Sequence, residues 1–169
     1  TNCSLANLGN TSYANALINA ISRIHSCRCL LANHQTTRTH QPGHPTDCLL
    51  CALAHDITRL TTIPLNEYFS PKVVEKRAHW DRLETFANCR QHDANEAFCA
   101  LLRACDDVDF QAFKRLDVVP GLGETSRIAY TTPHWKLFGA LVLQTTRCSA
   151  CPHVIFRHDV CTSFTLALP

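Results

Sequence analysis

Methionine is absent from all 169 residues, including position 1, and we therefore expect the chain to be a fragment or a processed piece. Long apolar runs are absent too, because no stretch approaches the roughly 18 consecutive apolar residues that a membrane span requires. Residues 1–10 also lack the basic and apolar regions of a secretory signal. These absences predict a soluble, unexported protein of the cytoplasm or nucleus, with no membrane partner.

A strong excess of one charge is also missing. Sixteen Lys and Arg side chains stand against fourteen Asp and Glu, which gives a net charge of +2 and a pI near 8.0. Nucleic-acid-binding domains commonly have a basic stripe or a pI above about 9, so we expect no nucleic-acid partner. With 46% hydrophobic and 18% charged residues, the composition is that of one globular domain with its own core.

Cysteine, in contrast, is abundant. The eleven cysteines are an odd number, and four of them form two Cys-x-x-Cys pairs. Reduced thiols with some metal binding fit this pattern better than a disulfide framework does.

Apolar periodicity predicts three helices in the first two thirds of the chain. The first begins at Ser12 or Tyr13 and runs for about three turns, with Asn10 or Thr11 as its N-cap. The others cover residues 50–60 and 94–105. Loop-rich composition marks residues 36–46 and 118–133.

After Pro133 the composition changes to β-branched and aromatic residues. Residues 137–146 and 154–168 are predicted to form two antiparallel strands joined by a turn that contains Cys148 and Cys151. Helices followed by strands indicate an α+β fold.

Residues 4–21, SLANLGNTSYANALINAI, resemble the cysteine box of ubiquitin-specific proteases. Two departures from the family pattern matter: Ser12 stands where the nucleophilic cysteine is usual, and Ala14 replaces a methionine. The resemblance places Asn7 in the oxyanion hole, although turn chemistry is the ordinary use of a loop asparagine. Gly9 would permit the tight turn, and the dipole of the following helix would favour an anion at position 12. The matching residues are Leu5, Asn7, Leu8, Gly9, Asn10, Thr11, Tyr13 and Asn15.

Residues 90–102, RQHDANEAFCALL, are similar to the family's Gln-Gln-Asp-Ala-His-Glu-Phe segment, with Phe98 one position late. The resemblance implies that Gln91 and Asp93 bind the extended C-terminal tail of ubiquitin. Asp93 followed three residues later by Glu96 also has the form of a capping box, and the two interpretations are compatible.

Residues 138–151, FGALVLQTTRCSAC, resemble the family strand that leads to the zinc-binding fingers, and residues 159–169 resemble its Leu-x-Leu-Pro strand. Cys148 and Cys151 would then supply half of a structural zinc site, since zinc takes four ligands. Reduced, metal-free thiols are the alternative.

A second Cys-x-x-Cys pair, Cys48 and Cys51, follows His40 and His44 at a spacing that could also bind zinc. Burial of both thiols as small apolar residues on a helix face is the simpler interpretation.

The resemblance implies a papain-like ubiquitin-specific protease hand. Residues from 1 to about 132 would form its helical thumb, and residues from about 133 to 169 the start of its fingers, ending before the histidine region of the palm. The implied activity is that of a thiol-type deubiquitinase with no catalytic cofactor, acting on ubiquitin or ubiquitinated proteins. Because a serine hydroxyl ionises far less readily than a thiol, we expect little or no hydrolysis with Ser12 in place.

Several alternatives stay open from the sequence. Ser12 is either a natural loss or a deliberate inactivating change, and no G-x-S-x-G elbow supports it as a true serine nucleophile. A non-catalytic ubiquitin-binding pseudoprotease is the main rival function, and a small zinc-stabilised structural domain is a third.

Overall fold

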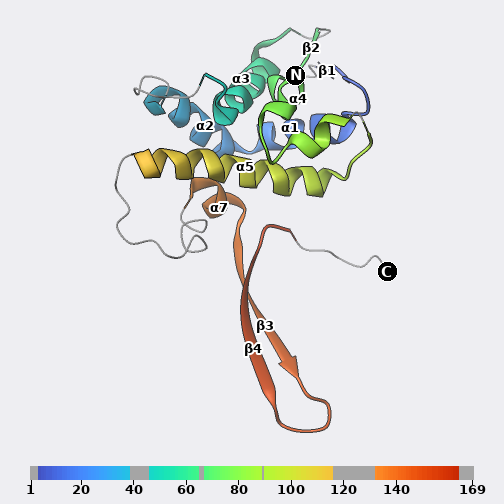
Figure 1. Cartoon of the computed structure of the whole chain (residues 1–169), viewed down its shortest axis with the longest axis vertical. Coiled ribbons are helices and arrows are strands. Elements are labelled where there is room, and N and C mark those ends of the chain that lie inside the picture. The colour runs from blue at the N-terminus through green and yellow to red at the C-terminus, as the bar shows by residue number, and fades with distance from the viewer. Residues whose placement is uncertain (1–3, 39–45, 65–66, 89, 116–131, 164–169) are drawn as a thin grey trace. The chain divides into compact units, whose positions relative to one another are not determined.

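The computed structural model describes residues 4–38, 46–64, 67–88, 90–115 and 132–163 (Figure 1). The chain forms two compact units, residues 1–123 and residues 124–169. The elements of the first unit are β1 (Ser4–Leu5), α1 (Ser12–Arg23), α2 (His25–Arg38), α3 (Leu49–Thr62), β2 (Tyr68–Phe69), α4 (Lys72–Glu75), η1 (Arg77–His79), η2 (Glu84–Asn88) and α5 (Ala94–Arg115). Those of the second are α7 (Pro133–Phe138), β3 (Ala140–Arg147) and β4 (Val154–Cys161).

Helix α3 is the central element of the first unit. It packs on α1, α2, α4 and α5, and Leu49, Leu50 and Ile57 are almost fully buried among these neighbours. The long helix α5 packs on α1 and α3 (Figure 1). The apolar periodicity of residues 50–60 therefore predicted this helix correctly, since its repeat matches the buried face.

The other two predicted helices are also present. Helix α1 begins at Ser12 with Thr11 as its N-cap residue. Helix α5 begins at Ala94, buries Leu101 and Leu102 as the periodicity indicated, and continues beyond the predicted end to Arg115.

Helix α2 was not predicted, and the expected loop at residues 36–46 is wrong at its start, because α2 extends to Arg38. Its buried positions are Cys27, Leu31 and His34, which recur at helical spacing. Two of the three are not aliphatic, so a count of aliphatic residues misses this face. Residues 39–45, with His40, lie outside the described residues, as do residues 118–131 of the second expected loop.

The second unit contains the predicted antiparallel hairpin. Strand β3 pairs with β4 in a continuous register from Ala140 opposite Cys161 to Arg147 opposite Val154. The structure is thus a mixture of helices with a small antiparallel sheet, in agreement with an α+β fold. The intervening turn holds Cys148 and Cys151, as expected.

The expected strand bounds need two corrections. Leu137 and Phe138 belong to helix α7, because Pro133 at its first turn favours a helix and Thr132 Oγ1 accepts a hydrogen bond from the Trp135 N–H. Strand β4 ends at Cys161 and not at residue 168, although residues 164–168 lie outside the described residues.

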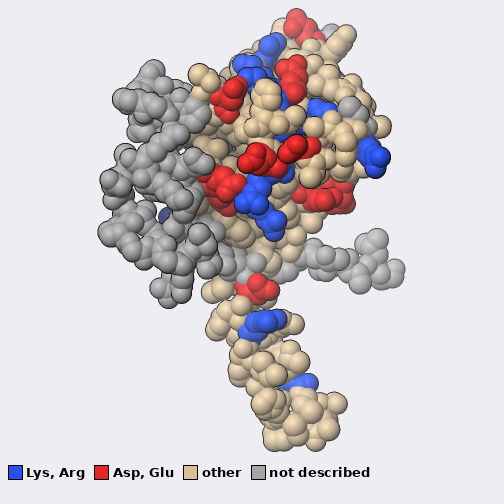
Figure 2. All heavy atoms as spheres, viewed as in Figure 1, with Lys and Arg blue, Asp and Glu red and all other residues tan. Residues whose placement is uncertain are grey.

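Three further observations concern apolar and charged residues. Among the described residues, no helix combines the length and the apolar character needed to cross a bilayer. On the face of the first unit drawn in Figure 2, acidic and basic side chains are interspersed. The hairpin instead exposes large apolar side chains: Leu141, Leu143, Ile155 and Phe156.

Candidate functional site: the start of α1 and a histidine–cysteine cluster

A tight turn leads the chain into α1. Gly9 and Asn10 both have positive φ values, 87° and 51°. Glycine adopts this left-handed region without a steric penalty, and asparagine tolerates it better than most residues. The turn leaves Ser12 exposed as the first residue of the helix, where the helix dipole favours a negative charge. The predicted roles of Gly9 in the turn and of Ser12 at the helix start are confirmed.

The side chain of Asn7 is held by Thr11. The Thr11 N–H donates to Asn7 Oδ1 over 3.0 Å, and the Thr11 hydroxyl lies 3.1 Å from the same oxygen. Because a backbone N–H can only donate, the atom facing it must be the amide oxygen of Asn7 and not its nitrogen. Asn7 Nδ2 therefore points away from Thr11, and among the described residues it has no hydrogen-bond partner.

Thr11 itself is fixed on both sides. It is buried, and its Oγ1 also accepts a hydrogen bond of 3.0 Å from the Leu8 N–H. The hydroxyl thus joins the two ends of the turn. The loop therefore holds the Asn7 amide in one orientation.

Asn15 anchors the segment before the turn, a role that the sequence match did not assign. Its Nδ2 lies 3.0 Å from the Ala6 carbonyl and 3.4 Å from that of Leu5. The Ala6 N–H in turn donates to the Phe69 carbonyl over 2.9 Å, next to the parallel pairing of β1 with β2. Asn15 therefore connects helix α1 to the segment between β1 and Asn7.

No described residue activates Ser12. Its hydroxyl makes no hydrogen bond with any described residue, so none of the described histidines is placed as its base. Proton transfer in acyl chemistry requires a base within hydrogen-bond reach of the nucleophile.

The start of α5 carries the second predicted group. Asp93 Oδ1 accepts hydrogen bonds from the Asn95 N–H at 2.8 Å and from the Glu96 N–H at 3.0 Å. The helix-capping interpretation of Asp93 is thereby confirmed. Gln91 is exposed, and its role in tail binding stays a prediction, as does that of Asp93.

His92 brings this segment to the start of α1. Its ring lies edge-on to Tyr13, with ring centres 5.4 Å apart, and 4.8 Å from the centre of the Phe86 ring. His92 Nε2 also lies 2.8 Å from Asn88 Oδ1. Because Tyr13 directly follows Ser12, the two segments matched from the sequence lie near each other in the fold.

Cys148 and Cys151 are exposed at the turn of the hairpin. The Ala150 N–H lies 3.4 Å from Cys148 Sγ, and this hydrogen bond is the largest cause of a lowered pKa of Cys148, followed by hydrogen bonds from Cys151. A thiol whose sulfur accepts N–H bonds and ionises readily suits a metal ligand. The two thiols fit half of a zinc site, and the described residues place no further ligand beside them.

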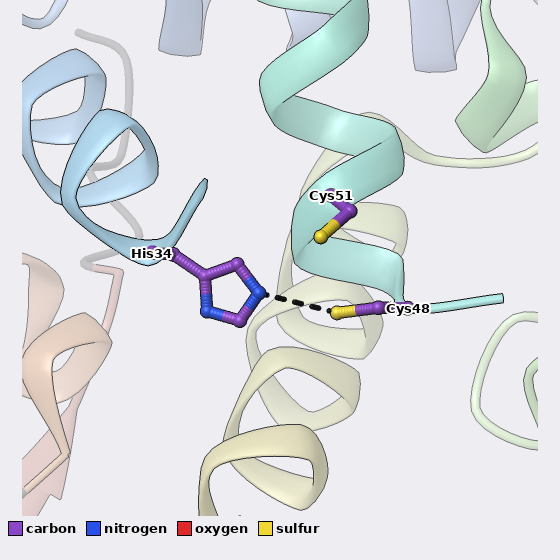
Figure 3. A group of neighbouring side chains, drawn as sticks. All are labelled: His34, Cys48 and Cys51. Atoms are coloured by element: carbon purple, nitrogen blue, oxygen red, sulfur yellow. Dashed lines mark hydrogen bonds between the residues drawn. The ribbon is translucent and has the colours of Figure 1, made fainter. Parts of the chain in front are cut away.

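A different group of ligating side chains lies between α2 and α3 (Figure 3). The ligand atoms of His34, Cys48 and Cys51 all lie within 4.8 Å of one another, and His34 Nε2 is 3.3 Å from Cys48 Sγ. Cys48 and His34 are buried, and Cys51 is partly buried. This cluster can hold a metal ion. His34 was missed in the sequence, where the nearer His40 and His44 were paired with these cysteines, and both of those lie outside the described residues.

The electrostatics of the cluster depend on whether a cation is present. Burial, and next the neighbouring Cys48, raise the pKa of Cys51 to about 12. Without a cation beside it, Cys51 is therefore a neutral thiol at pH 7. Among the described cysteines none forms a disulfide, in agreement with the expected reduced thiols.

Comparison with known proteins identifies relatives over nearly the whole chain. The family model described as ubiquitin carboxyl-terminal hydrolase matches residues 3–166. Proteins named ubiquitin carboxyl-terminal hydrolase 36 from Drosophila simulans and Drosophila sechellia are each 26% identical over 163 residues, covering 91% of this chain. The namesake from Drosophila pseudoobscura pseudoobscura is 27% identical over 169 residues.

The chain spans only 14–15% of the length of these relatives. The match nevertheless includes both the turn that carries Asn7 and Ser12 and the cap at Asp93. This chain belongs to the ubiquitin carboxyl-terminal hydrolase family.

Proposed function

We propose that this chain is the part of a deubiquitinase domain that contains the nucleophile position. It binds the C-terminal tail of ubiquitin but does not hydrolyse the bond that follows the tail, because Ser12 replaces the thiol nucleophile. The observation that carries the proposal is the fixed Asn7 amide beside Ser12. Thr11 holds its oxygen, so that its N–H donors point elsewhere. A preoriented amide donor is what an oxyanion hole requires in acyl transfer.

The position of Ser12 supports a silenced nucleophile. A thiolate at the first residue of α1 would be stabilised by the helix dipole. A hydroxyl gains little from the same place, since it stays protonated without a base, and no described residue offers it one. The site therefore keeps the features that position an acyl group and lacks the group that would attack it.

Asp93 has the chemistry to bind an extended peptide while it caps α5. Its Oδ1 accepts the two N–H bonds of the cap, and among the described residues Oδ2 has no hydrogen-bond partner. Oδ2 is thus available to a backbone N–H of the ubiquitin tail, and the exposed Gln91 lies two residues away. The proposal includes a palm that would complete the hand, and the described residues do not include it.

The proposal is tested by calorimetric titration of the chain with ubiquitin and with ubiquitin that lacks its C-terminal tail. We expect binding of intact ubiquitin and a clear loss of affinity without the tail. Asp93→Asn should weaken binding while α5 stays intact, because asparagine caps helices as well as aspartate does. Asp107→Asn, at an exposed position of the same helix, is the matched control and should bind normally. Equal affinity for the two forms of ubiquitin, or none for either, would contradict the proposal.

A further inference from the structure

We propose that His34, Cys48 and Cys51 bind a zinc ion that fastens helix α2 to helix α3. This site is separate from the thiols of the hairpin turn and does not depend on whether the start of α1 binds ubiquitin. Figure 3 shows the three side chains pointing toward one another, His34 from α2 and the two cysteines from the start of α3.

The distances suit zinc. Bonds of about 2.3 Å to sulfur and about 2.0 Å to nitrogen in a tetrahedron place a nitrogen and a sulfur ligand about 3.5 Å apart, and two sulfurs about 3.8 Å apart. His34 Nε2 and Cys48 Sγ are 3.3 Å apart, and no pair in the cluster exceeds 4.8 Å. Small rotations of the Cys51 side chain would therefore complete a trigonal face around one ion.

The donor set selects the class of metal. Two thiolates and one imidazole are ligands of zinc, whereas calcium and magnesium require oxygen ligands. The two cysteines stand three residues apart, with Cys48 as the N-cap residue of α3 and Cys51 in its first turn, so both sulfurs reach the same side of the helix start. The described residues supply three ligands to this group, so the fourth position of a tetrahedral ion would be open to water.

Burial gives the ion a structural role. Cys48 is 4% exposed and His34 8% exposed, and α2 and α3 pack directly on each other. Metal binding by ligands that meet only in the folded chain adds its free energy to folding. Zinc should therefore raise the melting temperature of the helical unit by several degrees, and a chelator should reverse the change.

The test measures zinc bound to the whole chain in a Cys148→Ser/Cys151→Ser background, which removes the hairpin thiols as a second source of metal. After dialysis against metal-free buffer we expect about one zinc ion per chain. Adding Cys51→Ser or His34→Gln should abolish retention. Cys29→Ser is the matched control: Cys29 lies 3.4 Å from His25 Nε2 on α2 but has no third ligand in the described cluster, so zinc should stay bound.

Circular dichroism establishes that each variant is folded, and X-ray absorption of the background protein gives a second measurement should a variant unfold. A shell with two sulfurs at about 2.3 Å and at least one nitrogen at about 2.0 Å supports the site. An absence of retained zinc, equal retention in Cys51→Ser, or a shell without sulfur would overturn it.

Discussion

Thr11 fixes the side-chain amide of Asn7 through two hydrogen bonds to one oxygen, from its backbone N–H at 3.0 Å and from its hydroxyl at 3.1 Å. The amide nitrogen is left to donate elsewhere, five residues before Ser12. This relationship connects the family's sequence motif to a physical function, because the donor is oriented before any ligand arrives.

The first prediction concerns that donor. In the Ser12→Cys form, Asn7→Ala should slow acyl transfer from a ubiquitin C-terminal thioester to the new thiol by about 100-fold, since an oxyanion then forms without its side-chain donor. Rates are measured by following the acylated chain by mass spectrometry. Asn33→Ala, an exposed asparagine on α2, is the control and should react at the parent rate. An unchanged rate for Asn7→Ala would remove Asn7 from the proposed oxyanion hole.

The second prediction concerns the cap of α5. Asp93→Ala should lower the free energy of unfolding by about 1 kcal/mol, because the Asn95 and Glu96 N–H groups lose their acceptor. Asp93→Asn should leave stability almost unchanged, since asparagine accepts the same bonds. Urea denaturation of the two variants separates capping from charge, and equal losses in both would show that the cap is not the stabilising interaction.

The third prediction concerns Asp56, a fully buried carboxylate of α3. Its two oxygens accept the Lys72 and Val73 N–H groups at 2.8 and 2.9 Å, and so it holds the start of α4. Asp56→Asn replaces one acceptor with a donor and leaves a buried N–H unpaired, which should cost about 1–3 kcal/mol of unfolding free energy. Asp107→Asn removes only an exposed ion pair with Arg82 and should cost less than about 1 kcal/mol.

Asp56 also makes stability depend on pH. Burial raises its pKa above that of the unfolded chain, against the opposing effect of the Val73 and Lys72 N–H groups and of His55. The folded state therefore binds more protons, and stability is lost as the pH rises through the folded-state pKa. The stability difference between the parent and Asp56→Asn should be largest at acid pH and shrink as the pH rises. A difference that grows with pH would mean that the hydrogen bonds outweigh burial.

The fourth prediction concerns the hairpin. One face of the β3–β4 ribbon carries Leu141, Leu143 and Phe156, and each of these side chains is more than half exposed. Such a face favours self-association. Leu143→Thr/Phe156→Thr should reduce concentration-dependent light scattering, whereas Thr146→Ser on the opposite face should not. Scattering that is unchanged by the double substitution would show that self-association uses a different surface.

The sequence predicted the parts of this structure in which local chemistry decides the outcome. Gly9 in the turn, Ser12 at the helix start and Asp93 as a cap all follow from rules that act over a few residues. Leu137 was placed in a strand together with the β-branched and aromatic residues that follow Pro133, whereas the structure starts helix α7 at that proline.

What failed depended on tertiary packing. Helix α2 was missed because Leu31 is the one aliphatic residue among the three described buried positions, which also include Cys27 and His34. His34 could not be paired with Cys48 from spacing alone, since only the packing of α2 against α3 brings them to 3.3 Å. The anchoring role of Asn15 likewise appears only when the Ala6 carbonyl is seen beside its amide.

The proposed function places the C-terminus of ubiquitin over residue 12. Its most direct test is reaction of the Ser12→Cys chain with ubiquitin that carries a thiol-reactive C-terminal group, at about pH 9, where a cysteine ionises without a base. Two controls are needed: Ala16→Cys places a thiol at an exposed position on α1, and the chain with Ser12 measures labelling of the cysteines already present. The Ser12→Cys chain should be labelled more than either control. Selective labelling at position 12 is the predicted result, and equal labelling of all three chains would contradict the assignment of this site to ubiquitin.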